Sequence, residues 1–122
     1  MKSSIFFPGS VLATTLATAL LSGCAQNPDV REGHDYTSGI TEKSPPEYLS
    51  CVKDELHGRA TTYEEGTGDS VKLYVDSTDP NKANGLVEMR NTGSHHQFTA
   101  YQRDAWYDHG RLLDAALMCS KA

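Results

Sequence analysis

The sequence predicts an α+β fold, a two-layer sandwich in which a helix, three or four antiparallel strands and a second helix follow one another. Two stretches, residues 48–56 and 105–119, place apolar residues at helical spacing, and residues 71–75 alternate between apolar and polar. A chain of 122 residues, 38% hydrophobic and 22% charged, has room for one globular domain.

The first helix is predicted from its boundaries as well as its spacing. Ser44 is suited to cap the helix, Pro45 to its first position, and Glu47 to complete a capping box. Gly58 follows the apolar stripe and is a typical residue after a helix end. We therefore expect a helix that begins after Ser44 and ends before Gly58.

The strands are predicted between the two helices. Val71, Leu73 and Val75 alternate with Lys72 and Tyr74, which is the period of a half-buried strand. Asparagine and glycine residues mark a loop over 76–85 and a hairpin turn over 91–94. The expected strands lie at residues 71–75, 86–90 and 96–101, with a possible fourth at 59–64.

The second helix is predicted over residues 104–119. Asp104 is a plausible cap, and Gly110 in the helix interior costs about 1 kcal/mol relative to Ala. His109 falls on the apolar stripe, so a buried histidine bonded to backbone is favoured there over a catalytic base. We expect both helices to pack on one face of the sheet.

The first 24 residues have the pattern of an export signal. Lys2 supplies a positive start, residues 5–21 are largely apolar, and the stretch ends at Leu21-Ser22-Gly23-Cys24. This ending resembles the lipobox of bacterial lipoproteins. The resemblance implies a signal peptide over residues 1–23, cleavage before Cys24, and acylation of Cys24 with chains such as palmitate. The alternatives are an ordinary secretory signal or an uncleaved anchor.

The same resemblance bears on location. In enterobacterial lipoproteins an aspartate after the cysteine retains the protein in the inner membrane, and this chain has Ala25 there. We therefore expect a lipid anchor in the outer membrane, with the protein facing the periplasm. Two or three acyl chains anchor stably because each buried methylene contributes about 0.8 kcal/mol.

A tether is predicted between the lipid and the domain. Residues 24–44 hold few apolar residues in no regular period, which is typical of a flexible linker, and leave residues 45–122 as the domain. The alternative is that residues 36–40 pack on the domain or add an edge strand.

Two cysteines remain once Cys24 is assigned to lipid. Cys51 lies in the first predicted helix and Cys119 at the end of the second. An even pair in an exported protein favours a disulfide, and antiparallel helices would make these positions neighbours. A redox-active thiol is the alternative, but the chain has no CxxC motif.

The charge limits the possible partners. Lys2 is the only charged residue before Cys24, so the remainder has 11 − 1 = 10 basic and 16 acidic residues, a net charge of −6. This excess argues against nucleic acid, whose phosphates need a basic surface. It suits a basic protein partner.

Tyrosines on the predicted strands indicate a binding surface. Tyr74 and Tyr101 should lie on the sheet face that the helices leave open, together with Lys72 and Glu88. The alternative is that the tyrosines pack among themselves or against the tether.

No catalytic residue, metal site or cofactor is predicted. His95 and His96 are weak metal candidates, because neighbours on a strand point to opposite faces. No common nucleophile, phosphate-loop or metalloprotease motif occurs, so we expect no enzyme activity.

The predictions together describe a small lipid-anchored binding protein that faces the periplasm. Two partners are considered: an enzyme that the protein blocks as an immunity or inhibitor protein, or an envelope assembly or secretion apparatus that it serves as an accessory. A metal or small-ligand binder using His95 and His96 is a third possibility.

Overall fold

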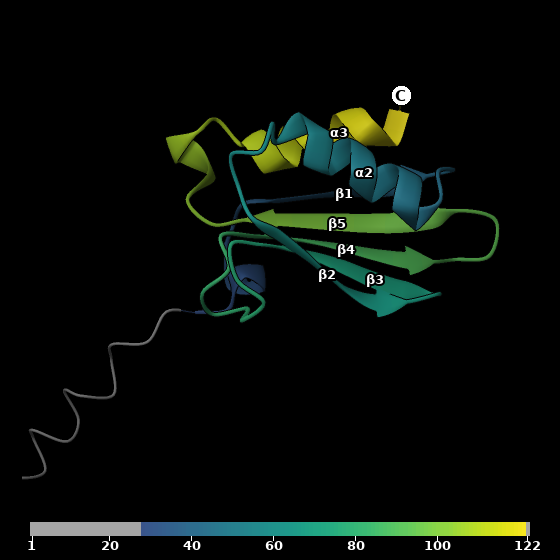
Figure 1. Ribbon diagram of the computed structural model, residues 1–122, viewed down its shortest axis with the longest axis horizontal. Helices are drawn as coiled ribbons and strands as arrows, with labels where there is room; N and C mark the ends of the chain where they lie inside the picture. The colour runs from purple at the N-terminus through teal and green to yellow at the C-terminus, as the bar shows by residue number, and fades with distance from the viewer. Residues whose placement is uncertain (1–27, 122) are drawn as a thin grey trace, which may run out of the picture.

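Two helices cover one face of a five-stranded antiparallel sheet (Figure 1). The computed structural model describes residues 28–121. This architecture confirms the predicted α+β two-layer sandwich, with five strands where three or four were expected. The strands are β1 (Tyr36–Thr41), β2 (Thr62–Thr67), β3 (Ser70–Val75), β4 (Gly85–Asn91) and β5 (His96–Gln102), and the helices are α2 (Pro45–Glu55) and α3 (Arg111–Lys121).

The strand order β1-β5-β4-β3-β2 places the first strand beside the last. Tyr36 pairs with Tyr101 and Thr41 with His96, both in antiparallel register. Residues 36–41 are therefore an edge strand, which was the alternative to a flexible tether over 24–44. The predicted tether is wrong from Pro28 onward, and the signal peptide, Cys24 and Ala25 lie outside the described residues.

The other strands lie close to their predicted positions. The strand expected at 59–64 is β2, which begins at Thr62 and continues to Thr67. At the expected hairpin turn between β4 and β5, the Thr92 amide donates to the His95 carbonyl over 2.9 Å.

The first helix begins and ends as predicted. Ser44 is extended and precedes Pro45, although its hydroxyl donates to the Glu47 carboxylate over 3.2 Å and caps no backbone amide. The helix ends at Glu55, and both His57 and Gly58 have positive φ, at 54° and 68°. Two successive left-handed residues cannot continue a right-handed helix, which explains where it ends.

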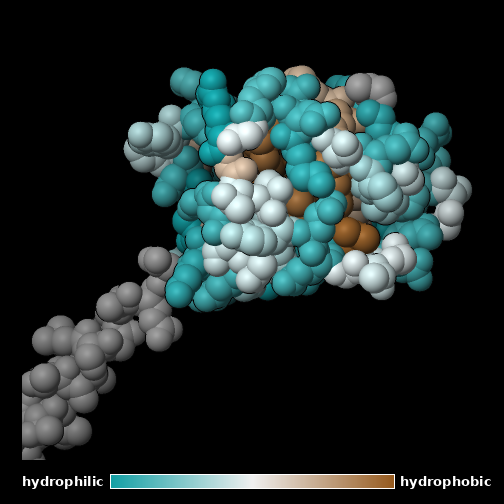
Figure 2. All heavy atoms as spheres, in the orientation of Figure 1, coloured by the Kyte–Doolittle hydropathy of each residue, from teal (hydrophilic) through white to brown (hydrophobic). Residues whose placement is uncertain are grey.

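The core lies between the helices and the sheet. Tyr48 and Phe98 are its largest fully buried side chains, and their ring centroids lie 5.2 Å apart. In the space-filling view, hydrophobic residues show in the middle of the face, between helices and strands, within a hydrophilic surround (Figure 2). The buried residues of this cluster are Tyr48, Leu49, Val52, Leu56, Leu73, Val75, Val87, Met89, Phe98, Ala100, Leu112, Ala115, Ala116 and Cys119.

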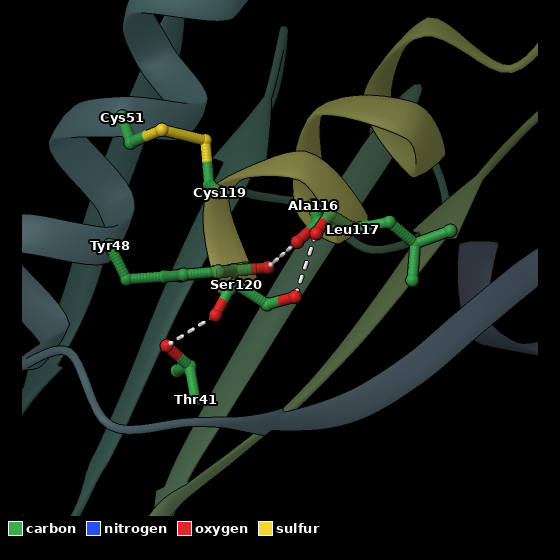
Figure 3. Close-up of a disulfide and its surroundings, with 7 residues drawn as sticks. All are labelled: Thr41, Tyr48, Cys51, Ala116, Leu117, Cys119 and Ser120. Atoms are coloured by element: carbon green, nitrogen blue, oxygen red, sulfur yellow. Dashed lines mark hydrogen bonds between the residues drawn. A yellow bond between two sulfur atoms is a disulfide. The ribbon is translucent and has the colours of Figure 1, made fainter. Parts of the chain in front are cut away.

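A disulfide between Cys51 and Cys119 joins the two helices, as predicted (Figure 3). Their Cα atoms are 5.8 Å apart. Close by, the buried Tyr48 hydroxyl donates to the Ala116 carbonyl over 2.7 Å, and burial raises the pKa of Tyr48. The Thr41 hydroxyl donates to the Ser120 carbonyl over 3.3 Å, so β1 is also bonded to the end of α3.

The second helix is shorter than predicted, because the chain breaks it before Arg111. Residues 105–107 form a separate turn, η3 (Ala105–Tyr107), and Asp104, His109 and Gly110 have positive φ. Asp108 then accepts from the Gly110 and Arg111 amides, and Gln102 accepts from the Leu112 amide over 3.0 Å. These side chains satisfy the first amides of α3, so a new helix begins there.

Candidate functional site

The two tyrosines singled out in the sequence, Tyr74 and Tyr101, belong to one row of residues across the open face, the sheet face opposite the helices. The strand register aligns Tyr36 with Tyr101, Tyr101 with Leu86, Leu86 with Tyr74, and Tyr74 with Tyr63. The row therefore crosses all five strands, close to the end at which β1 and β4 begin. We call this end the Pro28 end, because Pro28 is joined to it by hydrogen bonds described below.

The chain's own N-terminal segment covers the middle of this row. Val30, in the turn η2 (Val30–Glu32), is buried and packs with Tyr74 and Leu86. Tyr74 is only 5% exposed, so the prediction of an exposed Tyr74 is wrong. Tyr101 is half-buried against the same cluster, and burial and the Glu88 charge raise its pKa. The tyrosines thus pack against the segment that the sequence assigned to a tether.

The predicted charged residues of this face pair with each other. Lys72 and Glu88 are cross-strand neighbours whose Nζ and Oε2 atoms lie 3.6 Å apart. Arg31 of η2 approaches Glu88 to 3.7 Å and Asp29 to 2.7 Å, and its hydrogen bond lowers the pKa of Asp29 to about 2. All four groups are partly exposed, so the pairs contribute little to stability. They do align η2 on the sheet.

Arg103 holds the N-terminal segment at the Pro28 end. Its guanidinium group donates to carbonyls of two separate segments, those of Pro28 at 3.0 Å and Ala83 at 3.1 Å among them. The Val30 amide adds a bond of 2.9 Å to the Pro80 carbonyl. The side chain of Arg103, the residue that follows β5, therefore ties Pro28 to the loop between β3 and β4.

Strand β1 leaves an uncharged edge exposed. Tyr36 and Ile40, on the open face, are each 61% exposed, and no residue from Tyr36 to Thr41 is charged. The opposite edge, β2, carries Glu64 and Glu65. Natural sheets commonly protect free edges with charge, and an exposed, uncharged edge is a typical place for another chain to pair or dock.

A cavity of about 440 Å³ opens at the Pro28 end, on the helix side of the sheet. We call it the end cavity. It lies between the end of α2, the ends of β3 and β5, and the η3 turn. Leu56, Ala60, Val75 and Leu112 supply its apolar lining.

All four non-glycine residues with positive φ in the described part of the chain lie in or beside this cavity. Asp76 and Asp104 line it, His57 follows the lining residue Leu56, and His109 follows the lining residue Asp108. Aspartate and histidine are among the residues that tolerate the left-handed region best. Asp76 is further fixed by the Asn84 side-chain amide, which donates to its carboxylate over 2.7 Å.

The break before α3 exposes two aromatic side chains at the rim of the cavity. Trp106 is 75% and Tyr107 81% exposed, and their rings meet edge to face with centroids 5.9 Å apart. The sequence placed both on a continuous helix and so missed them as surface residues. His109, predicted to be buried, is exposed for the same reason. Asp104 and Gly110 flank this stretch, and these two residues were the signal in the sequence that could have predicted a break in the helix.

Two arginines beside this aromatic pair have unengaged side chains. Arg59 follows α2 and Arg111 begins α3, and both line the end cavity. Among residues 28–121 neither guanidinium group forms a hydrogen bond or ion pair. The site therefore combines an apolar lining, two exposed aromatic rings and two available cations.

The histidine candidates lie at the other end of the sheet. The Nδ1 atoms of His95 and His96 are buried and have no hydrogen-bond partner in the described part of the chain. Within residues 28–121, no three side chains of histidine, cysteine, aspartate or glutamate are grouped closely enough to hold a metal ion.

No helix within the described range has the length and apolar character that a membrane crossing requires. No protein-family model matches the chain, and no curated protein is significantly similar to it.

Proposed function

We propose that this protein is a small binding protein, held by lipid on Cys24 in the outer membrane and facing the periplasm. The four residues Leu21-Ser22-Gly23-Cys24 support the anchor through their resemblance to a lipobox. The disulfide between Cys51 and Cys119 suits an oxidising compartment such as the periplasm.

The surface that we assign to a protein partner is the β1 edge, defined by Tyr36, Ile40 and the free backbone edge between them. The observation that carries this assignment is the exposure of both side chains on an edge strand without a charge. Aromatic and aliphatic side chains of this kind are the usual energetic centres of protein interfaces. A partner strand would also satisfy the unpaired backbone groups of β1.

The net charge of −6 favours a basic partner. A soluble periplasmic enzyme would make the protein an immunity or inhibitor protein. An envelope assembly or secretion apparatus would make it an accessory lipoprotein. The two functions differ in what the β1 edge captures.

The experiment is a pull-down from solubilised envelope with the oxidised domain, residues 25–122, tagged at its C-terminus. We expect a stoichiometric partner that binds the wild-type domain and is lost with the double variant Tyr36→Ser, Ile40→Ser. Loss of a central aromatic anchor typically costs about 2 kcal/mol or more of binding free energy, which is roughly thirtyfold in affinity.

A matched control is available on the helix layer. Leu117 and Met118 of α3 are also exposed apolar residues, and the double variant Leu117→Ser, Met118→Ser removes a comparable surface away from β1. We expect this control to retain the partner. The assignment to the β1 edge would be contradicted if both double variants lost the partner equally, or if both bound it as well as the wild-type domain does.

A further inference from the structure

The aromatic pair, Trp106 and Tyr107, lies at the same end of the domain as the incoming chain. Trp106 and Pro28 line one small cavity of about 190 Å³, together with Arg103. In Figure 1 the first described residues, in blue, lie at the end of the sheet that also carries the η3 turn, in yellow-green. The most exposed aromatic residues of the domain therefore lie beside the point at which it is joined to the preceding chain.

The length of the preceding chain limits how far this end can lie from Cys24. Pro28 follows Cys24 by 28 − 24 = 4 residues, and four residues of fully extended chain span at most about 14 Å. A tether of twenty residues would have held the domain on the order of 25 Å away as a flexible chain. With β1 and η2 built into the domain, the Pro28 end is kept close to the anchor.

We propose that Trp106 and Tyr107 insert into the lipid headgroup layer and that Arg59 and Arg111 contact lipid phosphates. This inference rests on the proposed acylation of Cys24, because the anchor is what brings this end to the membrane. The partner that Trp106 and Tyr107 contact is therefore the same membrane that holds the lipid on Cys24.

The side chains match the chemistry of that layer. Tryptophan and tyrosine have an apolar ring and a polar group, and both concentrate at membrane–water interfaces. Arginine binds phosphate oxygens through its planar set of donors, and the guanidinium groups of Arg59 and Arg111 have no partner among residues 28–121. Both arginines line the end cavity, whose lining also includes the apolar Leu56 and Leu112.

Nearby carboxylates limit the electrostatic part of this contact. Asp76, Asp104 and Asp108 also line the end cavity, and the whole domain is acidic. Asp76 and Asp108 are engaged within the domain, by Asn84 and by the amides of Gly110 and Arg111. The contact should therefore depend on the rings and on the high local concentration that the anchor provides, and lipid-free protein should not bind vesicles.

The test uses Trp106 as its own reporter, because it is the only tryptophan in the chain. Acylated mature protein is reconstituted into phosphatidylethanolamine and phosphatidylglycerol vesicles with brominated acyl chains, which quench tryptophan on contact. We expect a blue shift of the Trp106 emission and loss of most of its intensity. The Arg59→Gln, Arg111→Gln variant should lose part of this quenching, and unchanged quenching would overturn the role of the arginines.

The control moves the reporter to the opposite end of the sheet. Ser94 is exposed in the turn between β4 and β5, so the variant Trp106→Phe, Ser94→Trp should remain unquenched in the same vesicles. Equal quenching of the two reporters, or none of Trp106, would overturn the inference.

Mass spectrometry of the same preparation separates the two possible failures. If Cys24 carries lipid and Trp106 is unquenched, the membrane contact is wrong and the anchor stands. If Cys24 carries no lipid, the proposed anchor itself is wrong, and with it the basis of the membrane contact.

Discussion

A domain that starts at Pro45 is expected to lose cooperative folding, whereas one that starts at Pro28 is expected to keep it. The longer form retains β1 beside β5 and Val30 over Tyr74 and Leu86. The shorter form lacks the edge strand β1 and also lacks Val30, so Tyr74 and Leu86 become exposed. We expect a loss of more than about 5 kcal/mol in the free energy of unfolding, which is comparable with the total stability of many small domains.

Circular dichroism melting of residues 28–122 and 45–122 measures this difference. The longer form is the matched control, because it removes the predicted signal and the first residues after Cys24 and leaves every described residue in place. A melting temperature for the shorter form within about 8 °C of the longer one, roughly 1 kcal/mol, would show that β1 is dispensable.

Removal of the disulfide is expected to lower the free energy of unfolding by about 4 kcal/mol. Cys51 and Cys119 are 68 residues apart in sequence, so the bond removes much of the conformational entropy of the unfolded chain. The double variant Cys51→Ala, Cys119→Ala, compared with oxidised wild type in urea denaturation, gives the size of the effect. Alanine is suitable because Cys119 is fully buried and a serine there would bury a hydroxyl.

Reductant provides the control for this experiment. Wild-type protein should fall toward the stability of the double variant when reductant is added, and the variant should not change. A difference of less than about 1 kcal/mol between oxidised and variant protein would mean that the bond contributes little.

Local patterns predicted the parts of the fold whose signals are local. Ser44, Pro45 and Gly58 bound the first helix, and alternation identified β3. The disulfide followed from where Cys51 and Cys119 fall on two helices. Each of these signals depends on residues within one element or on one simple packing rule.

The edge strand β1 could not be predicted in this way. Its sequence, Tyr36 to Thr41, has one aliphatic residue and a glycine, and its stability comes from pairing with β5 far along the chain. Gly39 illustrates the reason, because the position that a Cβ atom would occupy lies only 3.0 Å from the Phe98 ring. In the sequence, Gly39 is typical of a flexible linker. In the sheet, its lack of a side chain allows the Phe98 ring to pack closely against β1.

The candidate site was only partly predictable for a related reason. Tyr74 and Tyr101 were correctly placed on the open face, but Val30 covers Tyr74 through a segment that the sequence assigned to a tether. Trp106 fits a helical stripe by spacing and Tyr107 falls within the same predicted helix, but the positive φ at Asp104 and His109 breaks that helix. Such breaks depend on side-chain bonds from Gln102 and Asp108, which spacing alone does not reveal.

The central claim, a lipid anchor on Cys24, is tested most directly by mass spectrometry of the N-terminal peptide from the full chain expressed in a Gram-negative bacterium. We predict that the mature protein begins at Cys24 and that this peptide carries diacylglycerol and an amide-linked acyl chain. A mature protein with an unmodified Cys24, or one that retains residues 1–23, would contradict the anchor and the location proposed from it.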